Sequence, residues 1–437
     1  MAAEHADAVI VGARCAGSAT AIALARAGRR VVALDRVSFP ADTISTHLLW
    51  PGGVAELQAL DALERVMAIG APALPNALAA AGAITVRGTY TPVEGIDYAL
   101  CVRRTGLDAE LVAGAREAGA EVREGAQVTA LLTDDGRVAG VRWRDRDNRE
   151  RELRAPLVIG ADGRRSTVAR LLGADRRHRA CASGRACFYA YWNDERPDWR
   201  TTAAQWREGA ELGTAFPCED GLLLVLLQPP VARAGEFRAD LAGAYERSCA
   251  AIAGLAERLD GCRPATKVRA ATGIESYFRR SAGRGWALAG DAGHFKDPVT
   301  AQGIRDALRY GRLLGEAVAP VLDHPQRLDA AVARWERNRD RDCLEVYQWT
   351  NIVARGEPMA ALETELYRMA ADDPAVAREL LDVFSRSRRP SSVFTARRTL
   401  RLTGRALARR RAGTIASARR DIATAFADWR ERRVAFS

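Results

Sequence analysis

The sequence predicts a mixed α/β fold with three parts: a Rossmann-like nucleotide-binding domain, a domain built on an antiparallel sheet, and a helical C-terminal region. Three observations predict it. A short apolar run near the start leads through a glycine-containing turn into an Ala- and Leu-rich segment and a second apolar run. Apolar runs of strand length recur in the middle of the chain. From Asp329 onward the pattern is helical and highly charged.

Length and composition narrow the class of protein. With 437 residues the chain can form two or three interlocked domains. Its net charge of +10 comes from arginine, since lysine occurs only at Lys267 and Lys296. This bias favours a compositional origin over nucleic-acid binding, although a basic surface also attracts anionic cofactors and substrates.

Targeting signals and metal-binding patterns are missing from the sequence. The best apolar run, residues 222–227, has the length of a strand, so we expect no membrane span. The first residues lack a signal-peptide pattern, which favours a cytoplasmic protein. Eight cysteines without a Cys-x-x-Cys pair indicate reduced thiols, and no cluster has metal-ligand spacing, so we expect no metal.

The opening segment predicts a nucleotide-binding unit. Residues 8–11 form an apolar run, residues 12–17 read G-x-R-x-x-G, residues 18–27 favour a helix, and residues 31–34 form a second strand. Asp35 ends that strand 23 positions after Gly12, near the spacing expected for an acid that holds a ribose. The alternative is an ordinary βαβ unit without a ligand.

Each residue of this turn has a physical role to fill. Gly12 lets the chain turn sharply, and Gly17 lets the helix pack close to the sheet. The helix start then presents free N–H groups and a positive dipole to a pyrophosphate. Arg14 replaces the usual middle glycine, so its side chain could either obstruct the pyrophosphate or bind it. Ala16 and Arg36 flank these positions and complete the candidate cofactor-binding residues of this unit.

Two later segments repeat the pattern of an apolar strand followed by a glycine–aspartate or aspartate–glycine turn. Residues 157–160 lead into Asp162 and Gly163, and then into a helix through residues 168–172. Residues 286–289 lead into Gly290 and Asp291. A short stretch from Pro298 to Gly303 follows, and a helix is expected from residue 304 to about residue 321.

Together with an Arg-x-x-Leu-Asp segment at residues 104–108, these motifs resemble the p-hydroxybenzoate hydroxylase type of FAD-dependent monooxygenases and the related geranylgeranyl reductases and flavin halogenases. The four segments occur in the family's order over about the first three-quarters of the chain. The Ser-Thr-His sequence at residues 45–47 is most similar to that of a set of bacterial FAD oxidoreductases.

The resemblance implies FAD as cofactor and assigns candidate roles. Asp291, after Gly290, would bind the ribityl chain, and Arg104 would contact the phosphate or ribityl region. Asp162 and Gly163 would lie near the cofactor and the approach of the nicotinamide. Pro298, Gln302 and Gly303 would lie beside the isoalloxazine ring, where the positive end of the following helix would stabilise reduced flavin.

The resemblance predicts an FAD-dependent monooxygenase driven by NAD(P)H. It would hydroxylate or epoxidise an aromatic or polyketide-like hydrophobic molecule with molecular oxygen through a flavin C4a-hydroperoxide, as in antibiotic biosynthesis. A separate flavin reductase could supply the electrons instead. The alternatives are a reductase or dehydrogenase of a prenyl or other unsaturated substrate, and an FAD-binding protein without turnover. We expect a monomer or homodimer.

His47 and His294 are the candidate catalytic residues. His294 follows the Gly290–Asp291 turn and could hydrogen-bond the cofactor or only a loop carbonyl. His47 could act as a base or orient the substrate, or could be an ordinary loop histidine. Lys296 could pair with the adjacent Asp297 or favour anionic flavin. The candidate pocket-lining aromatics, each equally compatible with a plain core role, are Phe188, Tyr189, Tyr191, Trp192 and Trp206.

The predicted FAD-binding domain is discontinuous. It comprises residues 1–75, 100–180 and 270–335, and includes a hairpin at residues 122–141. The substrate-binding sheet comprises residues 76–99 and 181–269, and residues 336–437 form the C-terminal helical region. Four-residue spacing places Arg397, Arg401, Arg405 and Arg409 on one helix stripe, which would be either a solvated face or a binding face for an anionic partner or lipid.

Overall fold

The computed structural model describes residues 4–409 and 414–435, and it has the predicted mixed α/β class. Its first layer is a six-stranded sheet in the order β21-β22-β12-β2-β3-β8, parallel except for β21. The central strands β2, β3 and β12 are buried, almost entirely apolar runs, as expected for a parallel sheet covered on both faces. They are β2 (Ala8–Val11), β3 (Val31–Asp35), β8 (Glu121–Glu124), β12 (Leu157–Gly160), β21 (Ala282–Gly283) and β22 (Trp286–Leu288).

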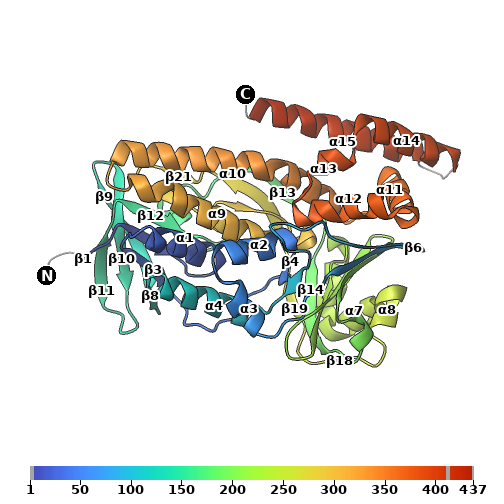
Figure 1. Cartoon of the computed structure of the whole chain (residues 1–437), viewed down its shortest axis with the longest axis horizontal. Coiled ribbons are helices and arrows are strands. Elements are labelled where there is room, and N and C mark those ends of the chain that lie inside the picture. The colour runs from blue at the N-terminus through green and yellow to red at the C-terminus, as the bar shows by residue number, and fades with distance from the viewer. Residues whose placement is uncertain (1–3, 410–413, 436–437) are drawn as a thin grey trace.

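Helices from distant parts of the chain cover this sheet. Helix α1 packs along α9 so closely that a Cβ at Gly311 would lie 2.5 Å from the Ala16 carbonyl oxygen. Figure 1 shows α10 running the length of this layer beside α9. The helices of this part are α1 (Cys15–Arg26), α2 (Pro51–Ala59), α3 (Leu63–Ala68), α4 (Arg104–Glu117), α5 (Thr167–Leu171), α9 (Gly303–Val318) and α10 (Pro325–Val353).

An eight-stranded sheet forms the second part of the molecule, with the main path β18-β14-β17-β16-β15-β5-β6 and β19 paired to β14. Helices α6 (Ala234–Ala239), α7 (Leu241–Ala251) and α8 (Ala253–Arg258) pack on one face. The strands are β5 (Asn76–Ala81), β6 (Ile84–Thr89), β14 (Cys187–Asn193), β15 (Thr202–Glu208), β16 (Glu211–Pro217), β17 (Leu222–Leu227), β18 (Arg263–Pro264) and β19 (Arg269–Ala271). Apart from the last two residues of β19, they come from the two stretches assigned to the substrate-binding sheet, but the division into domains stays a prediction.

Three smaller sheets complete the strand inventory of the described residues. The four-stranded one corrects the predicted hairpin at residues 122–141. Residues 121–124 join the parallel sheet as β8, and the hairpin is β9 (Gln127–Asp134) with β10 (Arg137–Arg144). The hairpin prediction ran one strand into the next because only two residues separate β8 from β9. The other strands are β1 (Glu4–His5), β4 (Leu48–Leu49), β7 (Leu100–Cys101), β11 (Glu150–Arg154), β13 (Arg177–Ala182), β20 (Glu275–Arg279) and β23 (His294–Phe295).

The C-terminal region is helical, as predicted. Helices α11 and α12 pack against β6 and close the edge of the eight-stranded sheet, and α14 and α15 form the outermost layer above them (Figure 1). None of the helices in the described part of the chain combines the length and apolar character needed to cross a membrane. The helices are α11 (Ala361–Asp372), α12 (Pro374–Ser385), α13 (Pro390–Val393), α14 (Ala396–Ala408) and α15 (Thr414–Ala435).

Candidate functional site

The candidate site forms where three neighbouring parallel strands end. The carboxyl ends of β2, β12 and β22 lie side by side: the Ala161 N–H donates to the Val11 carbonyl at 2.7 Å, and the Ala289 N–H donates to Gly160 at 2.8 Å. The Gly12 turn, the Asp162–Gly163 turn and the Gly290–Asp291 turn therefore meet at one edge of the sheet. In open α/β sheets, ligands bind at this edge.

The opening turn needs both of its glycines. Gly12 has φ of +99°, and a Cβ there would lie 2.5 Å from the Ala161 carbonyl oxygen. A Cβ at Gly17 would lie 1.8 Å from the Gly12 carbonyl oxygen. The first turn of α1 therefore lies directly behind the glycine turn, with its N–H groups and positive dipole end at the sheet edge. This arrangement fits a phosphate group.

Asp35 holds the turn in place. Its Oδ2 accepts a 2.7 Å hydrogen bond from the Ala13 N–H, and its Oδ1 accepts a 3.0 Å bond from the Val37 N–H. Each carboxylate oxygen keeps a further lone pair for a sugar hydroxyl. The next residue, Arg36, is exposed.

Arg14 is committed to protein acceptors. Its guanidinium donates to the Ala41 carbonyl at 3.0 Å, forms an ion pair with Asp108, and stacks over the Phe39 ring at 5.6 Å. Asp108 is fully buried, and Arg104 holds its other side through bonds of 2.8 and 2.9 Å. The residue that replaces the middle glycine thus clamps the 39–42 segment and α4 to the start of α1.

The Gly290–Asp291 turn lies against the same helix. A Cβ at Gly290, where φ is +57°, would lie 2.8 Å from the Cβ of Ala16. Burial raises the pKa of Asp291, and the nearby positive charges of Arg164 and Arg104 oppose that shift. Asp291 and Arg104, which are far apart in the sequence, are therefore close enough in the fold for their charges to interact.

Asp162 caps a helix. Its carboxylate accepts from the Ser166 hydroxyl at 2.5 Å and from the Thr167 N–H at 2.6 Å, at the start of α5. Gly163 has φ of +78°, and a Cβ there would meet no atom within 4 Å. Hydrogen bonds to the start of α5 thus fix the Asp162–Gly163 turn, and the space next to Gly163 is free of atoms from the described residues.

Open space also lies before α9. Gly303 begins this helix and is exposed, although its neighbours Gln302 and Ile304 are buried. A Cβ at Gly303 would meet no atom within 4 Å. The Gln302 amide donates to the Phe384 carbonyl at 2.9 Å, while its buried Oε1 has no hydrogen-bond partner among the described residues. Ala301, with φ of +52°, adopts a left-handed conformation that favours glycine.

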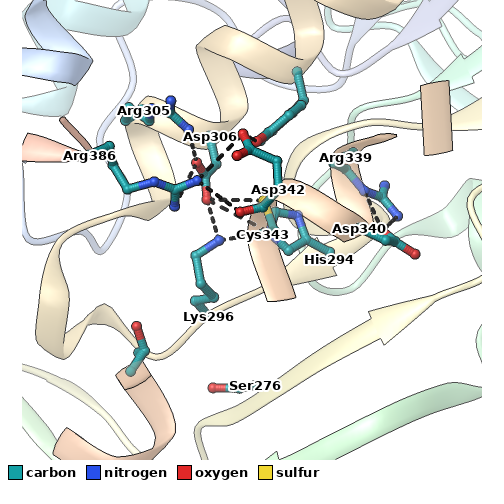
Figure 2. A network of polar contacts seen from close by, with 12 residues as sticks. Ser276, His294, Lys296, Arg305, Asp306, Arg339, Asp340, Asp342, Cys343 and Arg386 are labelled. Carbon is teal, nitrogen blue, oxygen red and sulfur yellow. Dashed lines mark hydrogen bonds and ion pairs between the residues drawn. The ribbon is translucent and has the colours of Figure 1, made fainter. Parts of the chain in front are cut away.

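A buried charge network lies behind this turn (Figure 2). Lys296 and Asp306 form an ion pair, and the Lys296 Nζ lies 2.8 Å from His294 Nε2. The predicted pairing of Lys296 with Asp297 is wrong, because the Asp297 carboxylate instead caps the Val299 N–H at 2.9 Å. Adjacent residues on an extended segment point to opposite sides, which separates the two charges.

The network fixes protonation states. Burial and the Lys296 charge hold the pKa of His294 well below its usual value, so its imidazole is neutral. Burial opposes ionisation of Asp306, but Lys296, Arg386 and Arg305 hold its pKa well below the usual range. His294, Asp306 and Cys343 could between them offer three metal ligands. The cation found among them is the Lys296 ammonium.

His47 is fully buried, with φ of +61°. Its Nε2 lies 2.9 Å from the Tyr191 hydroxyl, and its Nδ1 has no hydrogen-bond partner among the described residues. Burial, together with nearby arginines, lowers the pKa of His47 to about 3. The imidazole is therefore neutral at physiological pH and serves as a hydrogen-bonding group.

The two faces of the eight-stranded sheet separate the candidate pocket aromatics. Tyr189 and Tyr191 lie on the face toward His47, with ring centroids 5.6 and 5.7 Å from the imidazole. Phe188, Trp192 and Trp206 lie on the other face, packed against helices α6 to α8. Alternation along the strand explains the split between Tyr189 and Phe188, so only the two tyrosines remain candidates for contact with a substrate.

A continuous apolar cluster joins this sheet face to the turn before α9, and we call it the sheet–turn cluster. The Trp50 indole N–H donates to the Thr300 carbonyl at 3.0 Å, and its ring packs on Phe384 at 5.1 Å. The other members include Tyr90, Cys187, Tyr189, Tyr191, Phe216, Leu224, Leu226 and Ala301.

Sequence reasoning missed two central residues. Asp108 belongs to the recognised Arg-x-x-Leu-Asp segment, but nothing local showed that it also binds Arg14, 94 positions away. Asp306 was overlooked because its partners Lys296 and Arg386 lie in other segments. The rarity of lysine, which occurs at only two positions of the sequence, was the signal that could have pointed to the network around Lys296.

Comparisons with known proteins agree with this geometry. A family model described as an FAD binding domain matches residues 5–205. The menaquinone reductase of Mycolicibacterium smegmatis is 30% identical over 341 residues, covering 71% of this chain and 76% of that protein. Digeranylgeranylglycerophospholipid reductase 1 of Methanopyrus kandleri is 27% identical over 379 residues, covering 80% of this chain and 90% of that protein.

Solved structures share the fold. The myxobacterial chondrochloren halogenase CndH covers 89% of this chain and 99% of its own, with a TM-score of 0.73 at 21% identity. PqsL of Pseudomonas aeruginosa, described as a probable FAD-dependent monooxygenase, covers 87% of this chain and 100% of its own, with a TM-score of 0.65 at 20% identity. The fold is that of a flavoprotein. The chain belongs to the superfamily of FAD-dependent oxidoreductases that includes the p-hydroxybenzoate hydroxylase-type monooxygenases and the geranylgeranyl reductases.

Proposed function

We propose that the protein is a monooxygenase that uses FAD and NAD(P)H to oxidise an apolar, aromatic or polyketide-like small molecule. The observation that carries the proposal is the sheet–turn cluster. It joins the Tyr189–Tyr191 face of the sheet to Ala301, next to the open start of α9. When bound, FAD supplies the redox chemistry and the activation of oxygen.

Different candidate residues would bind different parts of FAD. The first turn of α1 would hold the pyrophosphate and Asp35 the ribose. Asp291 and Arg104 would hold the ribityl chain and the neighbouring phosphate. The isoalloxazine ring would lie before Gly303, where the positive end of α9 stabilises negative charge on reduced flavin.

The titratable groups of the cluster are uncharged near neutral pH, which suits a region from which water is excluded. Burial raises the pKa of Tyr189 and of Cys187 to about 12, and that of Tyr191 further still. His47, with a pKa lowered to about 3, is unprotonated. The cluster therefore presents uncharged hydrogen-bonding groups to an apolar substrate.

His47 and Tyr191 would position the substrate. The Nδ1 of His47 is buried without a described partner and can bond a polar group of the substrate. The apolar side chains around it exclude water from the reacting region.

A second candidate function is reduction of an unsaturated, prenyl-bearing molecule. It is favoured by the sequence relatives, which are named as menaquinone reductases and digeranylgeranylglycerophospholipid reductases. The same apolar cluster would accommodate such a substrate.

The decisive experiment compares oxygen dependence. The FAD-loaded protein is mixed with NADPH or NADH and with two test compounds, a polycyclic phenol and a short-chain menaquinone, in ¹⁸O₂ and under argon. If the protein is a monooxygenase, the product formed in ¹⁸O₂ contains one labelled oxygen atom, and no product forms under argon. A product that gains two hydrogens at the same rate under argon would establish the reductase and overturn the proposal. Bound FAD without NAD(P)H consumption under any condition, including with an added flavin reductase, would indicate a flavoprotein without turnover.

Variants on the two faces of one strand provide the matched control. Tyr191→Phe removes the hydroxyl that contacts His47, so we expect a higher KM or more NAD(P)H oxidation without product. Trp192→Phe alters the opposite face of the same strand and should leave both quantities unchanged.

A further inference from the structure

Helices α14 and α15 form the outermost layer of the molecule (Figure 1), and several of their large apolar side chains are exposed. Leu400 is 76% exposed, and Ile415 and Phe426 are each 58% exposed. Elsewhere in the described chain, exposed large apolar residues occur singly, at Ile44, Val231, Leu241 and Phe394. Contiguous exposed apolar side chains mark an interaction surface. The six on these helices are Leu400, Leu407, Ile415, Ile422, Phe426 and Trp429.

Helix α15 turns several polar side chains toward the body of the protein and leaves its large apolar side chains outward. It contacts the body of the protein through polar groups: Glu431 accepts from Arg179 at 2.8 Å and from Gln348 at 2.7 Å, and Arg432 donates to Gln348 at 2.7 Å. Near its start, the Ser417 hydroxyl accepts from the Ala361 N–H at 3.2 Å. A helix that serves only to cover the body would bury its apolar stripe instead.

The exposed apolar side chains of α15 form one stripe. At 100° per residue, Ile415, Ile422, Phe426 and Trp429 project within about 60° of each other. The Phe426 and Trp429 rings stack at 5.7 Å. Helix α14 behaves similarly, because it buries Leu402 while Leu400 and Leu407, seven positions apart, remain exposed.

Arginine dominates the charge of this surface. The two helices carry nine arginines and three acidic residues within their bounds, and the acidic residues Asp421, Asp428 and Glu431 are half-buried. Arg405 and Arg409 of the predicted stripe turn toward Glu365, 3.9 and 3.2 Å away. The exposed arginines are Arg397, Arg401, Arg419, Arg420, Arg430 and Arg433.

We propose that the exposed face of α14 and α15 binds the surface of an anionic lipid bilayer, with the apolar stripe at the boundary between headgroups and acyl chains. Exposed Trp and Phe side chains among arginines suit the boundary between the headgroups and the acyl chains of an anionic bilayer. The proposal concerns docking and does not depend on which reaction the protein performs.

The charge pattern selects this occupant over two others. A second copy docked through the same face would bring arginine-rich surfaces together, and like charges across an interface are costly. Nucleic acid would neutralise the arginines but would leave the apolar stripe without a partner. An anionic bilayer satisfies both features.

Vesicle sedimentation of the full-length, FAD-loaded protein tests the proposal. We expect binding to phosphatidylcholine–phosphatidylglycerol vesicles, little binding to phosphatidylcholine alone, and release at 0.5 M salt. The Phe426→Ser/Trp429→Ser variant should bind at least tenfold more weakly. Arg419→Gln/Arg430→Gln should also weaken binding, about fivefold for each arginine. All of these side chains are exposed, so circular dichroism and FAD content should not change.

Matched substitutions elsewhere serve as controls. Val231→Ser removes an exposed apolar side chain, and Arg238→Gln/Arg247→Gln removes two exposed arginines, far from α14 and α15. These variants should bind vesicles like the wild type. The proposal is overturned if the wild type does not sediment with anionic vesicles, or if the controls lose as much binding as the α15 variants. It is also overturned if the Phe426 and Trp429 changes abolish a dimer in solution without affecting vesicle binding.

Discussion

Lys296 is one of two lysines in the chain, and its side chain is almost completely buried. Burial of an ammonium group is costly unless its partners compensate for lost hydration. Asp306 and His294 provide that compensation, and Arg305 and Arg386 balance the remaining charge on Asp306. The network supports the turn that precedes α9, so its integrity determines the shape of the candidate flavin site.

The substitution Lys296→Met should lower the free energy of unfolding by about 3–5 kcal/mol, because it leaves Asp306 buried without its main partner. Lys267→Met, at the exposed lysine, should change it by less than about 0.5 kcal/mol. Denaturant titration measures both. The double variant Lys296→Met/Asp306→Asn should be more stable than Lys296→Met alone. If the double variant is no more stable, the ion pair does not account for the loss.

The buried histidine of the sheet–turn cluster links stability to pH. His47 has a folded-state pKa of about 3, against 6.5 for the ordinary group. Between these values the unfolded chain binds a proton that the folded protein does not, so the stability contributed by neutral His47 falls as pH decreases.

Relative to His47→Asn, the wild-type protein should therefore lose about 2 kcal/mol of stability between pH 7 and pH 5. Asparagine tolerates the left-handed backbone at this position, which keeps the comparison free of added strain. Denaturant unfolding at both pH values gives the difference, and other titrating groups cancel between the two proteins. A difference that does not change with pH would mean that His47 is not held neutral.

At the scale of single elements, the start of α9 is the position where structure and proposed chemistry meet. Gly303 has ordinary backbone angles and open space before it, so the fold itself does not require glycine there. A planar flavin ring lying against the helix start would explain why the residue at this position has no side chain. The element then has a binding role that packing alone does not explain.

Gly303→Ala should therefore leave stability unchanged or raise it by up to about 1 kcal/mol. Gly303→Val should lower FAD affinity at least tenfold while the protein stays folded. Flavin fluorescence titration and thermal unfolding of the apoprotein separate the two effects. Gly235→Ala, in another helix with equally open surroundings, is the control and should not affect FAD binding. Unchanged affinity in Gly303→Val would place the ring elsewhere.

At the scale of the whole molecule, α12 ties the parts together. Asp382 accepts from the Thr91 hydroxyl at 2.9 Å, and the Phe384 carbonyl accepts from Gln302 before α9. A Cβ at Gly52 would lie 2.3 Å from the Ser385 carbonyl oxygen, so α2 also packs directly on this helix. Such contacts make separate unfolding of the C-terminal region unfavourable.

Thermal unfolding should accordingly be one cooperative transition. The rise in flavin fluorescence on FAD release and the loss of far-ultraviolet circular dichroism should occur at the same temperature. Added FAD should raise both midpoints together because it binds only the folded state. Asp382→Asn should lower both midpoints equally. Two separated transitions would show that the C-terminal helices unfold independently of the flavin-binding part.

Local sequence was sufficient for the opening unit. The glycines at positions 12 and 17 and the acid at position 35 act within one strand–helix–strand stretch, where steric limits on a few residues determine the turn. The fold class and the helical C-terminal region followed from periodicity and charge in the same way. The resemblance to a flavoprotein superfamily rested on such local motifs and was confirmed by the family match and relatives.

Tertiary structure alone decided which distant groups meet. Arg14 with Asp108, Lys296 with Asp306, and the separation of the β14 aromatics between two faces depend on strand order and helix packing, which no short segment encodes. The orientation of α15 belongs to the same class. Its sequence does not show which side faces the protein, and only the polar contacts of Glu431 and Arg432 turn its large apolar side chains outward. Local sterics are determined by neighbouring residues, whereas burial and charge pairing are properties of the assembled fold.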